Sequence, residues 1–327
     1  MLFRSKYFDG LYPEPLDYNN PADFALAVTK AKEEIKHQIA KENSGLDWYD
    51  EDIAEAFRAT AKVIPELKKS NKRVLFTIMA GIMSPETTAR DNWVIAAQAF
   101  KHYIATGEIP GVNPANGKLW QGGLTSPNKK KQLDFLNNMV KDLREKGALN
   151  WLTTQHTVSE INEFRSKYGN IKSGIGGKAT DMVPALYAFG PKVGPFVSNL
   201  NGIHDVTVDK WMTRTFNRYF GTMLNAKGEI IDAPTEPQRR AIKNLINEVA
   251  QDANIKPYQA QSVLWFFEQN LYRELGTPAP SYGFSDGARK FLEQSAQGGD
   301  GGGKKGAGGN APSIGDLGRD RKSTRLN

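Results

Sequence analysis

Apolar residues recur every three to four positions along most of this chain, which is the period of an amphipathic α-helix. The pattern covers residues 21–43 and again 50–69. Residues 74–105 form two helical runs that break at Ser84-Pro85-Glu86, where serine and proline suit an N-cap and a first helical position. Further helices are predicted over residues 129–146, 157–168, 178–189, 238–252 and 257–275.

No segment alternates apolar and polar residues over the length of a convincing strand, and no internal repeat is visible. Residues 107–128 are rich in glycine and proline and are expected to form an irregular surface loop. The chain is therefore predicted to be all-α. We expect an N-terminal helical extension over 1–72, a helical domain over 73–276 and a flexible Gly-rich tail over 277–327.

The expected tail has one short helical patch, in SYGFSDGARKFLEQSAQ, and then a flexible Gly/Lys segment, GGDGGGKKGAGGN. Residues 320–327 read DRKSTRLN, which resembles the translation of a common sequencing-library adapter. This resemblance predicts that residues 320–327 are an artefact and that the native C-terminus is missing.

Composition narrows the possible functions. The 327 residues are 39% hydrophobic, enough for a substantial core, and the net charge of +7 fits a nucleic-acid partner as well as it fits an ordinary basic protein. The absence of cysteine excludes disulfides, thiolate metal sites, iron–sulfur clusters and cysteine nucleophiles. No apolar run reaches the roughly 18 residues of a membrane span, so we expect a cytoplasmic protein of a bacterial or phage-infected cell. The histidines do not form a metal-binding pair; they are His37, His102, His156 and His204.

The candidate chemistry lies in residues 189–218, which read FGPKVGPFVSNLNGIHDVTVDKWMTRTFNR. Lys192 lies in a Gly/Pro turn between apolar runs, and the helix after the turn has backbone N–H groups that can meet a phosphate. Asp209 opens the next helix. A lysine amine and a carboxylate beside a phosphate-binding turn are the groups needed to attack the anomeric carbon of a nucleotide's sugar. The stretch therefore favours a nucleic-acid enzyme.

Simpler interpretations exist for each residue taken alone. Asp209 is a favoured N-cap worth roughly 1 kcal/mol, and a lone lysine such as Lys192 is most often a solvated loop residue. The aromatic stripe over 265–272 is expected to be core rather than a platform for stacked bases. Lys129-Lys130-Lys131 is expected to be a solvated face or a helix start, with DNA-backbone contact as the alternative.

Two motifs carry a resemblance to a known family. They are Leu186-Tyr187-Ala188-Phe189-Gly190-Pro191-Lys192 and Val208-Asp209-Lys210-Trp211. Together they resemble the helix-hairpin-helix DNA glycosylase superfamily, the group of endonuclease III and 8-oxoguanine DNA glycosylase. Its members carry Leu-Pro-Gly-Val-Gly-x-Lys and then Val-Asp-x-His opening a helix, so Ala188 and Trp211 depart from the pattern. Weaker matches over 75–100, 174–179 and 258–272 extend the resemblance to roughly residues 74–275.

The resemblance implies a glycosylase domain over 73–276 that acts, as a monomer, on double-stranded DNA with a damaged or modified base. It implies that the hairpin N–H groups hold a phosphate while the target nucleotide flips out. Lys192 would attack the sugar carbon, and Asp209 would support both the deprotonation of the lysine and the cationic sugar. Because a free lysine with a pKa near 10.4 is protonated at neutral pH, Lys192 must be desolvated or lie beside positive charge.

The resemblance also implies further contacts. The residues expected to touch DNA are Gly190, Pro191, Val193, Gly194, Glu86, Thr87, Lys178 and Arg214. No cofactor is expected, and a monovalent cation held by hairpin carbonyls is left open by the sequence. Two rivals also remain open: a non-catalytic helix-hairpin-helix DNA-binding protein, and a helical structural or interaction protein, for example viral, in which the hairpin is only a turn.

Overall fold

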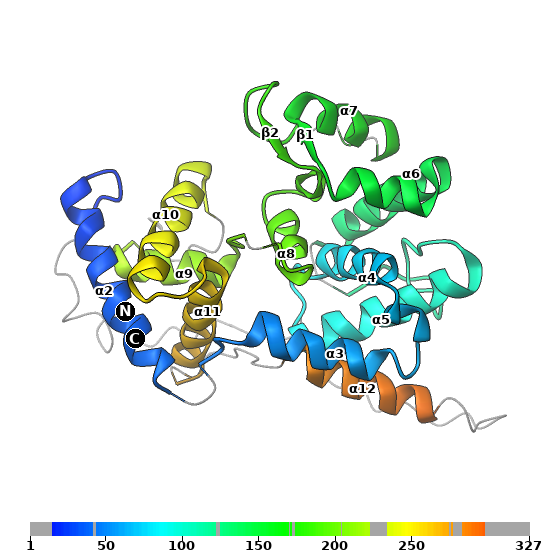
Figure 1. Cartoon of the computed structure of the whole chain (residues 1–327), viewed down its shortest axis with the longest axis horizontal. Helices are drawn as coiled ribbons and strands as arrows, with labels where there is room; N and C mark the ends of the chain where they lie inside the picture. Colours follow the sequence, from blue (N-terminus) through cyan, green and yellow to red (C-terminus); the bar gives the residue numbers. More distant parts are fainter. Residues whose placement is uncertain are drawn as a thin grey trace, which may run out of the picture.

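The computed structural model describes residues 15–41, 44–121, 125–169, 171, 174–203, 205–222, 234–274, 276 and 283–297, and confirms the all-α prediction for them (Figure 1). The α-helices are α2 (Pro21–Ile39), α3 (Ile53–Thr60), α4 (Ser70–Met83), α5 (Ala89–Thr106), α6 (Ser126–Leu152), α7 (Val158–Gly169), α8 (Val193–Leu200), α9 (Lys210–Tyr219), α10 (Glu236–Asp252), α11 (Pro257–Glu274) and α12 (Phe284–Gln297). Short π and 3₁₀ turns are η1 (Trp48–Asp52), η2 (Pro65–Lys68) and η4 (Ala185–Phe189). Within this part of the chain, no helix is long and apolar enough to cross a bilayer.

The described helices pack around two hydrophobic cores. The first is built by α3 to α8 and α12, and the second by α2, α9, α10 and α11, as the two groups of helices in Figure 1 show. Trp93 and Phe76 are fully buried in the first core, and Phe220 and Ile246 in the second. Residues between α8 and α9 pass from one core to the other.

The predicted N-terminal extension over 1–72 is not a separate unit. Ala31 and Ile35 of α2 pack in the second core, whereas Ala56 and Phe57 of α3 pack in the first. The boundary was wrong because each of these short amphipathic helices buries its apolar face against helices much later in the chain, which no local pattern reveals. Residues 1–14 lie outside the described range.

The helix predicted over 178–189 does not form. Met182–Pro184 is instead strand β2, which pairs antiparallel with β1 (Gln155–Thr157), and Ala185–Phe189 is the 3₁₀ turn η4. Pro184 explains the difference, since proline cannot donate a helical hydrogen bond and disfavours a helical conformation in the residue before it. The hairpin that carries Lys192 is therefore entered through a short turn rather than an α-helix.

The break between α4 and α5 falls where the sequence predicts it, but the cap differs. Thr88, not Ser84, is the N-cap of α5, and its hydroxyl accepts the N–H of Asp91 at 3.1 Å. Ser84 instead ends α4, and Glu86 between them has a φ of 53°. The connecting turn is thus longer than a Ser-Pro start implies.

The prediction of a flexible tail from residue 277 onward is wrong for residues 284–297, because they form helix α12, which packs in the first core. Phe284 and Phe291 are buried there, and Asp52 at the end of η1 accepts the N–H groups of Phe284 and Ser285. The apolar spacing Phe284, Ala288, Phe291 is that of a docked helix, although the Gly/Ser-rich flanks favoured a flexible tail. The remainder of the predicted tail, including 320–327, lies outside the described residues.

Gly287→Ala should destabilise the protein by about 1–3 kcal/mol, because α12 approaches α5 too closely for a side chain. An added Cβ would lie 2.5 Å from the carbonyl oxygen of Arg90 and 2.6 Å from the Cβ of Trp93. Urea denaturation measures the change. Gly147→Ala in α6 is the control, since its Cβ would meet only the Cβ of Leu143 at 3.2 Å; equal stability of both variants would show that α12 does not dock as described.

Candidate active site

Lys192 lies in a tight turn between η4 and α8. Gly190 adopts a φ of 99°, which favours glycine, and its N–H donates to the carbonyl of Tyr187 at 2.8 Å. An added Cβ on Gly194 would lie 2.6 Å from the ring of Tyr187 and 2.9 Å from the carbonyl oxygen of Leu186, so α8 packs directly on η4. Ala188 is buried in η4 without a positive φ, and the turn therefore accommodates this departure from the family pattern.

Asp209 is the N-cap of α9, and its carboxylate is held by three donors. Oδ1 accepts the backbone N–H groups of Trp211 and Met212 at 2.9 and 3.0 Å, and Oδ2 accepts the indole N–H of Trp265 at 3.0 Å. The Trp265 ring stacks on Trp48, with ring centroids 5.3 Å apart. A carboxylate offers about four lone-pair positions, so these three bonds fix the orientation of Asp209 and leave one position open.

The other departure from the family pattern, Trp211, is buried rather than presented to a ligand. Its ring packs edge-on against Tyr272 with centroids 5.2 Å apart, and Arg214 lies over both rings. Arg214, which was predicted to contact DNA, already packs over these two aromatic rings. Trp211 serves the packing of α9 on α11 where the family has a histidine.

Lys192 lies beside the first core and Asp209 beside the second. Val193, next to the lysine, packs in the first core, and Val208, next to the aspartate, packs in the second. Among the described residues, no ion pair joins the two side chains; the carboxylate nevertheless lies close enough to act electrostatically on the Lys192 amine. The arrangement leaves the amine free of a direct salt bridge.

The spacing of the pair is fixed by a buried polar network in the connecting segment. Asn199 near the end of α8 accepts the N–H of Asp205 at 2.7 Å and donates to the hydroxyl of Thr207 at 3.3 Å. The N–H of Thr207 donates in turn to Gln261 of α11 at 2.7 Å. Because these groups are buried and bonded to one another, movement of α9 relative to α8 would leave polar groups unpaired.

The electrostatics of Lys192 suit a nucleophile. Its side chain is partly buried, and this burial lowers the pKa of the amine, with Lys210 adding to the effect and Asp209 and Glu86 opposing it. A lowered pKa increases the neutral fraction, which is the form that attacks carbon. A lysine that acts as a nucleophile at neutral pH needs desolvation or a neighbouring positive charge. Lys192 has both, in its burial and in Lys210.

The residues predicted to contact DNA differ in exposure, and Gly190 and Thr87 are half-buried. Pro191 and Glu86 are exposed, and Glu86 acts electrostatically on the Lys192 amine, so the 84–88 turn and the hairpin are neighbours. Val193 and Gly194 are buried and can offer only backbone groups. Lys178 is exposed in the turn before β2, and within the described range no hydrogen bond or ion pair joins it to Lys192 or Asp209.

Lys129 is a residue that the sequence interpretation missed. It was expected on a solvated face or at a helix start; it does lie in the first turn of α6, yet only 1% of it is exposed. Its amine donates to the hydroxyl of Thr87 at 2.7 Å and to the carbonyl of Gln121 at 2.5 Å. Burial, together with the positive charge of Lys192, lowers the pKa of Lys129 to about 7, and Glu86 opposes the shift. The missed signal was its spacing of four and seven residues from the apolar Leu133 and Leu136, which places all three on one helical face.

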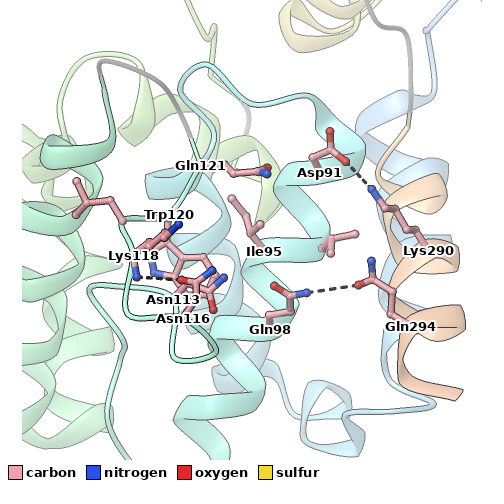
Figure 2. Close-up of a pocket in the computed structure, with 12 residues that line it drawn as sticks. Asp91, Ile95, Gln98, Asn113, Asn116, Lys118, Trp120, Gln121, Lys290 and Gln294 are labelled. Atoms are coloured by element: carbon pink, nitrogen blue, oxygen red, sulfur yellow. Dashed lines mark hydrogen bonds and ion pairs between the residues drawn. The ribbon is translucent and has the colours of Figure 1, made fainter. Parts of the chain in front are cut away.

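A pocket of about 340 Å³ lies between α5, α12 and the loop before α6 (Figure 2). Most of its polar groups are paired with one another: Asp91 with Lys290 at 2.9 Å, and Gln98 with Gln294 at 3.4 Å. Gln121 lines the pocket, and its backbone carbonyl accepts an N–H of the Lys129 amine. This residue therefore connects the pocket to the candidate site.

The monovalent cation that the resemblance leaves open would be held by carbonyls of the hairpin. The carbonyls of Tyr187 and Gly190 accept the N–H groups of Gly190 and Gly194, and that of Phe189 accepts the amide of Gln132 at 3.0 Å. Each of these oxygens accepts one hydrogen bond and keeps a second lone pair, so the cation remains a prediction. No group of three metal-binding side chains lies within the described ranges, and His204 falls outside them.

Comparison of the chain with protein-family models, with curated proteins and with solved structures finds no match.

Proposed function

We propose that this chain is a DNA base-excision glycosylase with AP lyase activity, with Lys192 as the nucleophile and Asp209 as its electrostatic partner. The observation that supports the proposal best is the position of the two side chains. A partly buried lysine with a lowered pKa follows a glycine turn, and a carboxylate oriented by three N–H donors acts on it electrostatically from beside the other core.

The proposed reaction starts on a nucleotide turned out of the duplex. The neutral Lys192 amine attacks the anomeric carbon, the bond from that carbon to the base breaks, and the electron pair leaves with the base, which takes up a proton. The Asp209 carboxylate stabilises the positive charge that develops on the sugar. One amine proton then passes to solvent and the other to the ring oxygen as the sugar ring opens and an imine forms. Loss of a proton from the neighbouring sugar carbon then eliminates the adjacent phosphate.

DNA would be held by backbone and side-chain groups around the hairpin. In the first turn of α8 the N–H groups of Gly194 and Phe196 already donate to the carbonyls of Gly190 and Lys192, and Pro195 has no N–H. Of this turn, the Val193 N–H is the group left to meet a phosphate. Pro191 is exposed beside it, and Lys210 adds positive charge near Lys192. Double-stranded DNA with a damaged or modified base is accordingly the proposed substrate, bound with the salt dependence that phosphate contacts produce.

Borohydride trapping tests the proposal. The native chain is incubated with duplexes carrying an abasic site, 8-oxoguanine or an oxidised pyrimidine, and we expect a covalent protein–DNA adduct on at least one of them. Digestion and mass spectrometry should place the modification on Lys192. An unmodified duplex is the matched control.

Failure to form an adduct on any duplex would exclude lyase chemistry. A base-release assay with the native chain and Asp209→Asn then separates a monofunctional glycosylase from a protein that only binds. Salt-dependent DNA binding without base release would favour a non-catalytic helix-hairpin-helix protein, and no DNA affinity would favour a structural or interaction protein.

A further inference from the structure

The pocket between α5, α12 and the loop before α6 has an apolar lining beneath a set of carboxamides (Figure 2). Its volume of about 340 Å³ lies within the roughly 300–1,000 Å³ of small-molecule sites. Val94 and Ile95 of α5 give it an aliphatic surface that is nearly covered, at 5% and 7% exposed. Neither Lys192 nor Asp209 lines it. The pocket is thus a candidate site for a second ligand.

The charges on the helix walls of the pocket neutralise each other. The Asp91 carboxylate accepts the Lys290 amine at 2.9 Å and the Thr88 hydroxyl at 3.0 Å. Lys118, the other charged residue of the lining, is exposed on the loop. A charged ligand buried against Val94 would need a partner of opposite charge, and the Asp91–Lys290 pair supplies none. The lining therefore favours a neutral ligand.

The loop presents two carboxamides in fixed orientations. The Oδ1 atoms of Asn113 and Asn116 accept the N–H groups of Ala115 and Lys118, both at 2.9 Å. Because each oxygen faces the backbone, each NH₂ group is left as a donor, and no acceptor among the described residues takes it. The Asn113 N–H also donates to the Lys118 carbonyl at 2.8 Å and closes the loop. These donors are held in place before a ligand arrives, which lowers the cost of binding.

The helices present two further carboxamides, Gln98 of α5 and Gln294 of α12. The Gln98 amide donates to the Gln294 side-chain oxygen at 3.4 Å, a long and exposed hydrogen bond that a ligand can replace at little cost. The Gln98 oxygen and the Gln294 NH₂ group have no other partner in the described part of the chain. Figure 2 shows this pair on the opposite side of Ile95 from Asn113 and Asn116. One side of the pocket thus offers donors, and the other offers a donor and an acceptor.

A purine base has the shape and the hydrogen-bonding groups that this arrangement requires. It is neutral, and its flat apolar faces can lie on an aliphatic surface. It also carries hydrogen-bonding groups at both ends, N7 with the 6-substituent at one and the pyrimidine-ring nitrogens at the other. A pyrimidine base has such groups at one end and bare ring carbons at the other. A monosaccharide has hydroxyls around its whole ring, which the aliphatic lining cannot match.

We propose that this pocket binds a purine base. Gln98 and Gln294 pair with one edge of the base, as carboxamides do with N6 and N7 of adenine. The NH₂ groups of Asn113 and Asn116 donate to ring nitrogens at the other edge. The base can belong to a free nucleoside or to a nucleic-acid strand, because both bring the same chemistry. The inference does not rest on the proposed function, since the pocket uses neither Lys192 nor Asp209.

Isothermal titration calorimetry with the full chain measures the binding of adenosine, cytidine and glucose. We expect adenosine to bind about tenfold more tightly than cytidine, because the pyrimidine leaves the carboxamides of one side unpaired, and glucose to bind no better than cytidine. Absence of adenosine binding would overturn the proposal, and so would equal binding of cytidine or glucose.

Gln98→Leu removes the hydrogen-bonding groups of one side while keeping the size of the side chain. We expect it to weaken adenosine binding about tenfold, and Gln294→Leu to act in the same way as a second variant. Gln297→Leu is the matched control, because Gln297 is exposed on α12 outside the pocket lining. Thermal unfolding checks that each variant folds. Native affinity in both Gln98→Leu and Gln294→Leu would overturn the proposal.

A short strand of deoxyadenosines identifies the source of the base. Tighter binding of the strand than of deoxyadenosine, lost at high salt and weakened by Gln98→Leu, would assign the pocket to a nucleic acid. Binding of the nucleoside at least as tight as that of the strand, and independent of salt, would assign it to a free nucleoside. If borohydride trapping fails but adenosine binds through Gln98, the proposed function fails and the pocket stands. If trapping succeeds but adenosine does not bind, the pocket fails alone.

Discussion

Replacing Lys192 with alanine should abolish the borohydride-trapped adduct and leave the fold and the DNA affinity nearly unchanged. The adduct needs an amine that attacks the sugar, and alanine has none. The fold should tolerate the change because the Lys192 side chain makes no cap hydrogen bond to α8 and its backbone has a φ of −98°. Gel analysis of the cross-linked species measures the adduct, thermal unfolding the fold, and DNA binding at two salt concentrations the affinity.

Lys210→Ala is the matched control for this change. Lys210 is exposed, opens α9 and contributes positive charge near Lys192, but it is not placed to attack a flipped nucleotide. We expect it to lower DNA affinity modestly while retaining the adduct. An adduct that persists in Lys192→Ala would mean that another amine is the nucleophile, and the buried Lys129 and the N-terminus would be the next candidates to map.

The helical character and the N-cap at Asp209 could be predicted because each depends on a local signal. Apolar periodicity places α2, α5, α10 and α11 close to their observed positions, and a carboxylate before an amphipathic run predicts the N-cap at Asp209. Those signals are properties of short windows of sequence. They do not report which helix packs on which.

The remaining features depend on contacts between distant parts of the chain. Helix α12 is short and flanked by flexible-looking sequence, and its order comes from burial against α3 and α5. The 178–189 segment has a helical composition, yet Pro184 and the pairing of β2 with β1 prevent the helix. Lys129 looked solvated because lysine usually is, and only the approach of Thr87 and Gln121 makes its burial possible.

Arg218→Met should produce the largest loss of stability, about 3–5 kcal/mol, because it leaves buried carboxylates without their cation. Arg218 donates to both oxygens of Glu34 at 2.8 and 2.7 Å and to Glu268 at 2.9 Å, and so joins α9 to α2 and α11. Glu268 is fully buried, and Tyr219 adds a hydrogen bond to Glu34 at 2.7 Å. Urea denaturation at neutral pH measures the loss.

Arg289→Met is the control, since Arg289 also bridges two carboxylates but is 52% exposed. Exposed ion pairs contribute about 0–1 kcal/mol, so this variant should lose little stability. A comparable loss in both variants would show that burial is not the reason for the effect at Arg218.

The loss in Arg218→Met should depend on pH in a defined direction. Burial raises the pKa of Glu268 above its ordinary value, and Arg218 opposes that rise. Without Arg218 the pKa rises further, so the folded variant binds a proton that the unfolded chain releases, and its stability increases as pH falls through that window. The deficit relative to the native chain should therefore be largest near neutral pH and shrink toward about pH 5.

Arg218→Met combined with Glu268→Gln tests whether the buried carboxylate causes the loss of stability, because glutamine removes the charge that the first change leaves unpaired. We expect the double variant to be more stable at neutral pH than Arg218→Met alone and to lose most of the pH dependence. Glu34 also loses its cation and is closer to solvent, with 14% of its side chain exposed. It should account for the part of the lost unfolding free energy that the double variant does not regain. If the double variant is as unstable as the sum of the single changes, the two residues do not interact, and the buried charge would not be what holds α2 and α11 to α9.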